Sequence, residues 1–339
     1  MIGATGTVGQ RLVRRLHDHP WFRLTTLAAS ARSAGKTYGE AVHWLLPTAL
    51  PDSVAEIEVR DVREVHDCDV VFSALGSSTA REVEPVLARR GLMVVSNASA
   101  LRMHPRVPLL IPEVNPDHLE MLDHQDFGSG GVVTNPNCST VGLVLSLKPL
   151  ADAFDIEAVQ VTTLQAISGA GHPGVPSLDI LGNTLPLIPG EEEKLETEPQ
   201  KLLGSVTGGA FSPAPFSVSA QANRVPVVDG HLVSVSVKLG RPVLAEDARS
   251  VIDDFRSPVA DLHLPSAPRR PVVAIDDGPR PQPKLDGDRE DGMTVTIGRI
   301  RSCPVFNLRY VALVHNTERG AAGAAVLNAE LLAATGRLA

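Results

Sequence analysis

The sequence predicts an α/β protein whose first domain is a doubly wound parallel sheet and whose second domain is α+β. Three observations support this prediction. At 339 residues, the chain is longer than one hydrophobic core usually serves. Short apolar runs alternate with helical patterns through the first half, which is typical of parallel strands joined by helices. The chain also opens on a glycine-spaced turn that leads into a helix.

The opening turn predicts a dinucleotide-binding site. Three glycines follow a G-x-x-G-x-x-G spacing ahead of a predicted helix at residues 8–17. Such glycines let the backbone approach a pyrophosphate, and the helix N-terminus faces the phosphates. A turn of this kind is a weak signal alone, because small residues before helices are common. The predicted cofactor contacts are Gly3, Thr5, Gly6, Thr7 and Val8.

The first strand is unusually short in this sequence. Only Met1 and Ile2 precede the glycines, whereas a mean strand has about 5–6 residues. In a doubly wound fold the first strand is central, so its absence would leave backbone groups of both neighbours unpaired. We therefore expect translation to start upstream with an apolar, β-branched segment. The alternative is that Met1 is the true start and that the domain tolerates the gap.

The next strands predict the remaining cofactor contacts. The strand at residues 24–29 ends where an NAD enzyme carries an acidic residue for the ribose. Here Ser30, Arg32 and Ser33 follow instead, which suits a 2′-phosphate and predicts NADP. A solvated basic loop is the alternative. Further strands at 69–75 and 92–96, separated by a helix that Thr79 could cap, place Ser73, Leu75 and Asn97 at the ligand-binding edge of the sheet.

Cys138 is the strongest candidate nucleophile. Residues 131–133 form a predicted buried strand, Asn135-Pro-Asn137 breaks it, and a helix begins near Ser139. The unpaired N–H groups and the dipole at a helix start favour an anion, so we expect the thiolate to form more readily than in water. The same amides could stabilise an oxyanion. The alternative is a buried, inert cysteine.

The second half predicts a separate sheet and a returning helix. Strands are predicted at 157–167, 232–239, 293–301 and 308–315, and residues 264–292, rich in Pro, Asp and Gly, are predicted to be irregular. A charged helix begins near Gly190, and its charges are expected to face solvent. Asn316 or Thr317 could cap a last helix at 319–332. We predict a first domain at 1–134, onto which residues 317–339 pack, and a second domain at 135–316.

Composition excludes several classes of protein. A net charge of −8 argues against a nucleic-acid binder. The absence of a long apolar run and of a signal peptide argues against a membrane protein and favours the cytoplasm. Cys68, Cys138 and Cys303 lack metal-site spacing, so no metal is predicted and the cysteines are interpreted as thiols in a reducing compartment.

Taken together, these motifs resemble those of the aspartate-β-semialdehyde dehydrogenases, in their archaeal and fungal branch. The matching stretches span nearly the whole chain: Gly3–Gly9, Ser30–Lys36, Asn137–Thr140, Gln165–Gly171, Glu191–Lys194, Arg224–His231 and Asn316–Gly323. Several motifs in the family's order are far more specific than any one of them. His172 departs from the pattern, since an aromatic residue is expected there.

The resemblance implies an NADPH-dependent reduction of L-4-aspartyl phosphate to L-aspartate 4-semialdehyde, without a metal. It implies a Cys138 thioester, an acid/base role for His231, and acyl-group orientation by Gln165. Other implied contacts are Arg224 and Glu192 for the substrate carboxylate and amine, Arg102 and Lys194 for phosphate, and Ser168, Gly169 and Asn316 for the cofactor. A homodimer or homotetramer is also implied.

Three other functions stay open at this point. A malonyl-CoA reductase on the same scaffold would need room for a CoA arm and no amine-binding acid. An N-acetyl-glutamyl-phosphate reductase has a nucleophile motif that differs from Asn137-Cys-Ser-Thr140. An inactive NADP-binding sensor would not need to retain Cys138, Gln165, Arg224 and His231 together.

Overall fold

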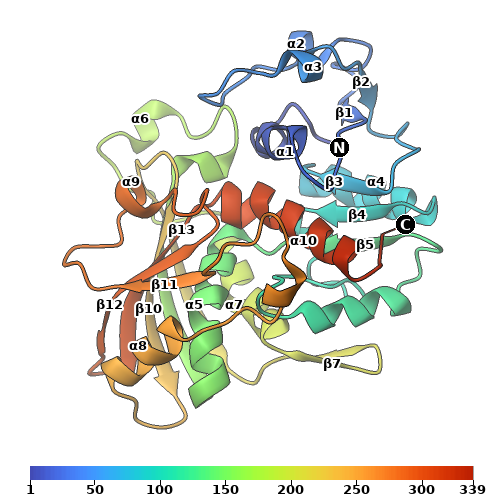
Figure 1. Cartoon of the computed structure of the whole chain (residues 1–339). Coiled ribbons are helices and arrows are strands. Elements are labelled where there is room, and N and C mark those ends of the chain that lie inside the picture. The colour runs from blue at the N-terminus through green and yellow to red at the C-terminus, as the bar shows by residue number, and fades with distance from the viewer. Residues whose placement is uncertain (339) are drawn as a thin grey trace.

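The computed structural model describes residues 1–338 and contains two domains, each built on one main sheet (Figure 1). In the first domain, Ile2 bridges Ala28 on one side and Ser73 on the other, which joins five short strands into one parallel sheet. The order is β2-β1-Ile2-β3-β4-β5. The strands are β1 (Leu27–Ala29), β2 (Val59–Asp61), β3 (Val70–Ser73), β4 (Met93–Ser96) and β5 (Gly131–Thr134).

Helices cover both faces of this sheet. Helix α1 (Thr7–His17) packs beside α10 (Gly323–Ala334), and Leu12, Leu16, Leu327 and Leu331 belong to one apolar cluster. Helix α4 (Ser77–Arg89) covers the other face. Tyr38 of α2 (Tyr38–Ala41) and Val54 of α3 (Asp52–Ala55) belong to the same apolar cluster as α1 and α10. The doubly wound sheet and the returning C-terminal helix are therefore both confirmed.

The second domain is built on a six-stranded mixed sheet in the order β11-β12-β13-β10-β6-β9. Helix α5 (Cys138–Phe154) packs on one face of it with α7 (Glu191–Leu202) and α8 (Ala245–Asp253). The strands are β6 (Ile156–Gln165), β9 (Ser217–Arg224), β10 (His231–Leu239), β11 (Val272–Ile275), β12 (Val295–Ser302) and β13 (Leu308–Val314). Smaller elements are α6 (Ser177–Ile180), the hairpin β7 (Ser205–Thr207) and β8 (Ala210–Ser212), and α9 (Pro283–Asp286).

Several boundaries differ from the sequence predictions for local reasons. Strand β1 begins at Leu27 and not at Leu24, because Met1 and Ile2 offer it partners only from Thr26 onward. Thr79 does not cap α4, which starts after Gly76 without a side-chain cap. Thr317 also forms no cap, and a π-helical turn (Glu318–Ala322) leads into α10.

Across residues 1–338, no helix has the length and apolarity needed to span a membrane.

A buried ion pair fixes the turn before α10 to the first domain. Arg319 Nη2 donates to Glu113 Oε2 at 2.6 Å, and both side chains are about 1% exposed. Such a pair holds only while both charges are present, because either one alone would be desolvated without compensation.

We expect Glu113→Gln to lower the free energy of unfolding by about 3–5 kcal/mol, since it leaves the Arg319 charge unpaired. The matched control is Asp152→Asn, which breaks the half-exposed i,i+4 pair with Lys148 and should cost less than about 0.5 kcal/mol. Urea unfolding of the three proteins measures both values, and equal losses would contradict the assignment.

Candidate active site

A cleft of about 690 Å³ lies between the two domains, at the carboxyl ends of β3 and β4. It is lined by loops of the first domain, by the starts of α5 and α7, and by the segments around residues 168–172 and 316–321. The lining includes Thr5, Gly6, Thr7, Val8, Leu75, Asn97, Arg102, Cys138, Gln165, Ser168, Gly169, Glu191, Lys194, Arg224 and Asn316. Most of the predicted site residues therefore face one cavity.

The opening turn forms one wall of the cleft. Gly3 has a positive φ of 75°, and a Cβ on Gly9 would lie 2.2 Å from the Gly3 carbonyl oxygen, so neither position accepts another residue without strain. Gly6 precedes α1 and supplies no side-chain cap, which leaves the first helical N–H groups directed at the cleft. This wall fits the pyrophosphate of a dinucleotide.

Some predicted cofactor contacts lie away from the cleft. Ser73 is completely buried and does not line the cleft. The residues of this segment that line it are Ala74 and Leu75, which follow β3. The prediction for Ser73 is therefore wrong as a side-chain contact. Ser30, Arg32 and Ser33 lie on the turn after β1, outside the cleft, and Arg32 is exposed.

Cys138 is the first residue of α5 and is partly exposed in the cleft. Asn137 caps the helix, and its Oδ1 accepts hydrogen bonds from the N–H groups of Ser139 and Thr140 at 3.0 and 3.3 Å. Burial raises the pKa of the thiol to about 12, and the Glu191 carboxylate adds to the shift, whereas Arg102, the Ser139 N–H and Arg224 oppose it. This direction is opposite to the expectation of a readily formed thiolate, because desolvation of the ligand-free site outweighs the helix end.

Two carboxylates of α7 organise the surroundings of Cys138. Glu191 Oε2 accepts from Asn137 Nδ2 at 2.8 Å and from Gln165 Nε2 at 3.2 Å, and Oε1 accepts from Lys194 Nζ at 2.7 Å. Glu198 accepts the Asn137 backbone N–H at 2.7 Å and Arg102 Nη1 at 3.0 Å. Each carboxylate therefore connects α7 to the residue that precedes Cys138.

Glu192 is not placed where the sequence analysis assigned it. Its carboxylate accepts the Ala222 N–H on the edge strand β9 at 3.0 Å and does not line the cleft. Neighbouring helical residues point about 100° apart, so Glu191 faces the cleft and Glu192 does not. The placement does not support a substrate contact by Glu192, and Glu191 is the carboxylate at the start of α7 that lines the cleft.

Of the inward face of α7, only Lys194 was predicted from the sequence. Glu191, Lys194, Glu198 and Lys201 follow an i, i+3, i+7, i+10 spacing, which is the signal that could have identified this face. Lys201 donates to the carbonyl oxygens of Arg102, His104 and Val107 at 2.7–2.9 Å, and burial lowers its pKa to about 7. It thereby fixes the loop that carries Arg102.

Three neighbouring strands present Gln165, Arg224 and His231. Gln165 and Arg224 are paired in register at the ends of β6 and β9, and His231 begins β10. Arg224 Nη1 donates to the Ala166 carbonyl oxygen at 2.7 Å, and the Ala166 N–H donates to His231 Nδ1 at 3.0 Å. A Cβ on Gly169 would lie 2.8 Å from Arg224 Nη1 and 3.2 Å from His231 Nε2, so both atoms lie directly behind this glycine.

His231 is neutral in this arrangement. Burial lowers its pKa to about 3, and the Arg224 charge adds to the shift. Because Nδ1 accepts a hydrogen bond, the neutral ring carries its hydrogen on Nε2, and Nε2 has no partner within residues 1–338. The His231 ring therefore offers an N–H hydrogen-bond donor at Nε2, and neither of its nitrogens is free to accept a proton.

Two further contacts close the cleft. Asn316 Nδ2 donates to Ser168 Oγ at 2.8 Å, and its Oδ1 accepts the Gly230 N–H at 2.8 Å, next to His231. His172, the residue that departs from the expected aromatic, lines the cleft, and its ring centroid lies 5.6 Å from that of His43.

Comparison with known proteins finds relatives that match over nearly the whole chain. Residues 1–122 match the family model of the semialdehyde dehydrogenase NAD binding domain, and residues 147–319 match that of the semialdehyde dehydrogenase dimerisation domain. The chain is 52% identical to an aspartate-semialdehyde dehydrogenase of Methanothermobacter thermautotrophicus and 47% identical to one of Schizosaccharomyces pombe. These alignments cover 98% of this chain and 97% and 96% of the relatives.

A solved structure of aspartate semialdehyde dehydrogenase with NADP from Candida albicans matches with a TM-score of 0.92 and 41% identity, over 99% of this chain and 98% of that one. The resemblance seen in the motifs is thus confirmed along nearly the entire sequence. The chain belongs to the aspartate-semialdehyde dehydrogenase family.

Proposed function

We propose that this protein reduces L-4-aspartyl phosphate to L-aspartate 4-semialdehyde with NADPH, a step in the synthesis of lysine, threonine and methionine. The observation that carries the proposal is the convergence of Cys138, Gln165, Arg224, Arg102 and Lys194 on the cleft that the glycine turn lines. NADP supplies hydride chemistry when it is bound. The NADP named for the Candida albicans structure supports this choice of cofactor.

The substrate contacts follow from the charges around Cys138. Arg224 provides a planar fork for the substrate carboxylate, and Glu191, in place of Glu192, provides the acid for the amine. Arg102 and Lys194 provide the positive charges for phosphate. Both cations already contact α7 carboxylates, so phosphate shares Arg102 with Glu198 and Lys194 with Glu191.

The bonding changes can be balanced with these residues. The Cys138 sulfur attacks the acyl carbon, the C–O bond to phosphate breaks, and the thiol proton leaves with phosphate as hydrogen phosphate. This route needs no separate base, which agrees with the high pKa of Cys138 and the low pKa of His231. After reduction of the thioester carbon, the His231 Nε2–H donates a hydrogen bond to the developing thiolate as the carbon–sulfur bond breaks, and a proton taken up from solvent restores the Cys138 thiol.

We also propose a homodimer as the minimal assembly, in the cytoplasm. The dimerisation-domain match supports self-association. So do three exposed leucines of the second domain: Leu164 on β6, which is 39% exposed, and Leu178 and Leu181 at α6. The three free cysteines fit a reducing compartment.

The proposal is tested by phosphate-dependent reduction of NADP with aspartate semialdehyde, compared with malonyl-CoA-dependent oxidation of NADPH. We expect activity only in the first assay. Cys138→Ser should bind NADPH normally but lose at least about 1,000-fold in kcat, since a hydroxyl is far less ionised and less nucleophilic. Substantial activity of Cys138→Ala, or activity only with malonyl-CoA, would refute the proposal.

The ionisation of Cys138 is tested by alkylation of the ligand-free enzyme with iodoacetamide. Because the thiolate reacts and the thiol pKa is about 12, the rate at Cys138 should rise about tenfold per pH unit from pH 7 to pH 10. Peptide mass spectrometry separates Cys138 from Cys68 and Cys303. A plateau below pH 8 would mean that the thiolate is the resting form.

The two glutamates at the start of α7 form a matched pair for testing the amine site. Glu191→Gln should lower kcat/KM for aspartate semialdehyde by about 100-fold, because a charge-assisted bond to the substrate is lost. Glu192→Gln keeps a hydrogen-bond acceptor for the Ala222 N–H and should change kcat/KM by less than about threefold. The reverse order would restore the role first predicted for Glu192.

Arg32 is the candidate contact for the 2′-phosphate, supported by its place on the turn after β1. Arg32→Ala should weaken the binding of NADPH about tenfold, because a charge-assisted hydrogen bond is lost, and should leave the affinity for NADH nearly unchanged. Titration of both cofactors by fluorescence measures the two affinities. Equal weakening of both would place Arg32 outside the cofactor site.

A further inference from the structure

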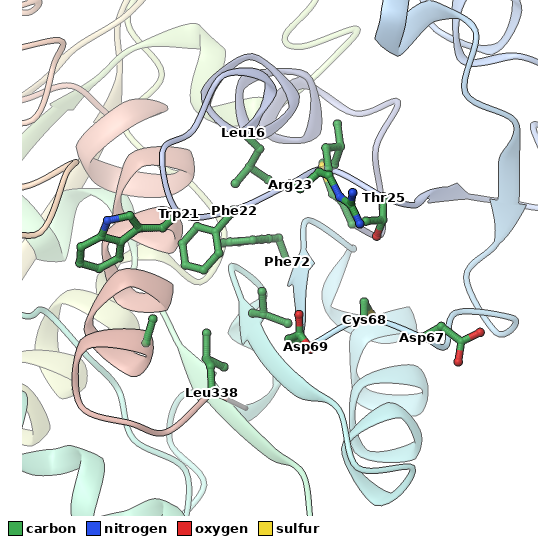
Figure 2. A pocket seen from close by; sticks show the side chains of 14 residues that line it. Leu16, Trp21, Phe22, Arg23, Thr25, Asp67, Cys68, Asp69, Phe72 and Leu338 are labelled. Atoms are coloured by element: carbon green, nitrogen blue, oxygen red, sulfur yellow. The ribbon is translucent and has the colours of Figure 1, made fainter.

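Helix α1, whose first residues line the active-site cleft, has an apolar side and a basic side. On the apolar side, Leu16 and the nearby Phe22 border a cavity of about 530 Å³ (Figure 2). The basic side borders a different cavity, of about 570 Å³, and its three arginines are Arg11, Arg14 and Arg15. Their i, i+3, i+4 spacing places them on one face of the helix. The proposed mechanism assigns no role to these arginines.

The three arginines converge on one carboxylate, that of Glu318 in the π-helical turn. Arg11 Nη1 and Arg14 Nη2 donate to Oε1 at 2.8 and 2.7 Å, and Arg15 Nε donates to Oε2 at 2.5 Å. The Glu318 side chain is only 3% exposed. Burial by itself would raise the pKa of Glu318, but the charges of the three arginines outweigh burial and hold this pKa below its ordinary value. The charged carboxylate therefore fixes the π-helical turn to α1.

Arg11 differs from the other two arginines because it also contacts Asp229. Arg11 Nη2 donates to the two carboxylate oxygens of Asp229 at 3.3 and 3.4 Å, and Thr317 Oγ1 donates to the same carboxylate at 3.5 Å. Asp229 lies two residues before His231. Arg11 therefore connects the helix that begins at the cofactor wall to the segment that ends at the histidine.

The segment at residues 225–230 also holds the loop that carries Gly169. Two N–H groups of this loop, at residues 167–168, donate to the carbonyl oxygens of Val227 and Val228 at 2.8 and 3.2 Å. The glycine lies directly against the guanidinium and imidazole groups of the cleft. A displacement of the segment would therefore move this loop and the histidine that follows the segment together.

The turn around Glu318 supplies a second connection to the reacting groups. Asn316, which precedes this turn, bonds to the neighbour of His231 and to the loop described above. A Cβ on Gly320 would lie 2.6 Å from Cys138 Cβ, so the turn packs directly against the nucleophile. The arginine cluster is thus connected to the cleft through two separate segments.

We propose that Arg11 is a positioning residue for His231 and that it acts through Asp229. The inference rests on the proposed function, in which hydride arrives from a cofactor at the start of α1 and His231 Nε2–H serves the departing sulfur. Arg11 holds these two parts of the site at a fixed separation. Small displacements of reacting groups cost large factors in rate, so this contact affects turnover more than binding.

The test is a double-mutant cycle that consists of Arg11→Gln, Asp229→Asn and the variant with both changes. Arg14→Gln is the matched control, because it removes one of the three arginines from Glu318 and leaves the contact with Asp229 intact. The measurements are kcat and KM in phosphate-dependent reduction of NADP with aspartate semialdehyde, NADPH affinity by fluorescence titration, and Tm.

We expect Arg11→Gln and Asp229→Asn each to lower kcat about tenfold, and the double variant to lose no more than either, because the two side chains act as one unit. KM values and NADPH affinity should change less than about threefold. Arg14→Gln should change kcat less than about twofold, and Arg11→Lys should recover part of the loss because it keeps the charge. The Asp229 side chain is 31% exposed, so Tm should stay within about 2 °C.

Multiplicative losses of kcat in the double variant, or an equal loss in Arg14→Gln, would overturn the proposal. Losses of kcat that follow losses of Tm across the series would do the same, since they would assign the cluster to stability alone. A wild-type enzyme inactive in this assay would overturn the proposed function and this inference with it. An active wild type with unchanged variants would overturn this inference alone.

Discussion

The active site depends on one constraint. Two buried carboxylates of α7, Glu191 and Glu198, must each be paired with hydrogen-bond donors and a positive charge. Both side chains lie in the interior, where a carboxylate is stable only if its charge and its hydrogen-bonding capacity are satisfied. Glu198 meets this requirement with Arg102 from the first domain and with the backbone just before Cys138. Glu191 meets it with Asn137, Gln165 and Lys194. These partner residues stay in position around Cys138 because moving them away would leave a buried carboxylate without a partner.

This constraint also sets the resting chemistry of the site. The Glu191 charge raises the pKa of Cys138, whereas Arg102 and Arg224 lower it, and desolvation decides the balance in favour of the thiol. His231 is likewise neutral, with its hydrogen on Nε2. The ligand-free cleft therefore holds Cys138 and His231 uncharged, beside Arg102 and Lys194, which are paired with carboxylates. Arg224 donates to a backbone carbonyl oxygen, so its charge is available to an anionic substrate.

The sequence predicted those parts of the structure that depend on local patterns. Glycine spacing, apolar runs and the helix after Asn137 placed the dinucleotide turn, the parallel sheet and Cys138 correctly, because each depends on residues close in sequence. Glu191 was missed because a run of four charged residues resembles a solvated face, and only packing against α5 shows which side is buried. The pKa of Cys138 depends on burial by distant segments, and β11 lies in a Pro-rich stretch whose pairing with β12 is a tertiary contact.

The most direct test of this account is mass spectrometry of the enzyme mixed with L-4-aspartyl phosphate in the absence of NADPH. The account predicts an aspartyl thioester on the peptide that contains Cys138, formed together with one equivalent of phosphate. Release of phosphate without an adduct, or an adduct on Cys68 or Cys303, would contradict it.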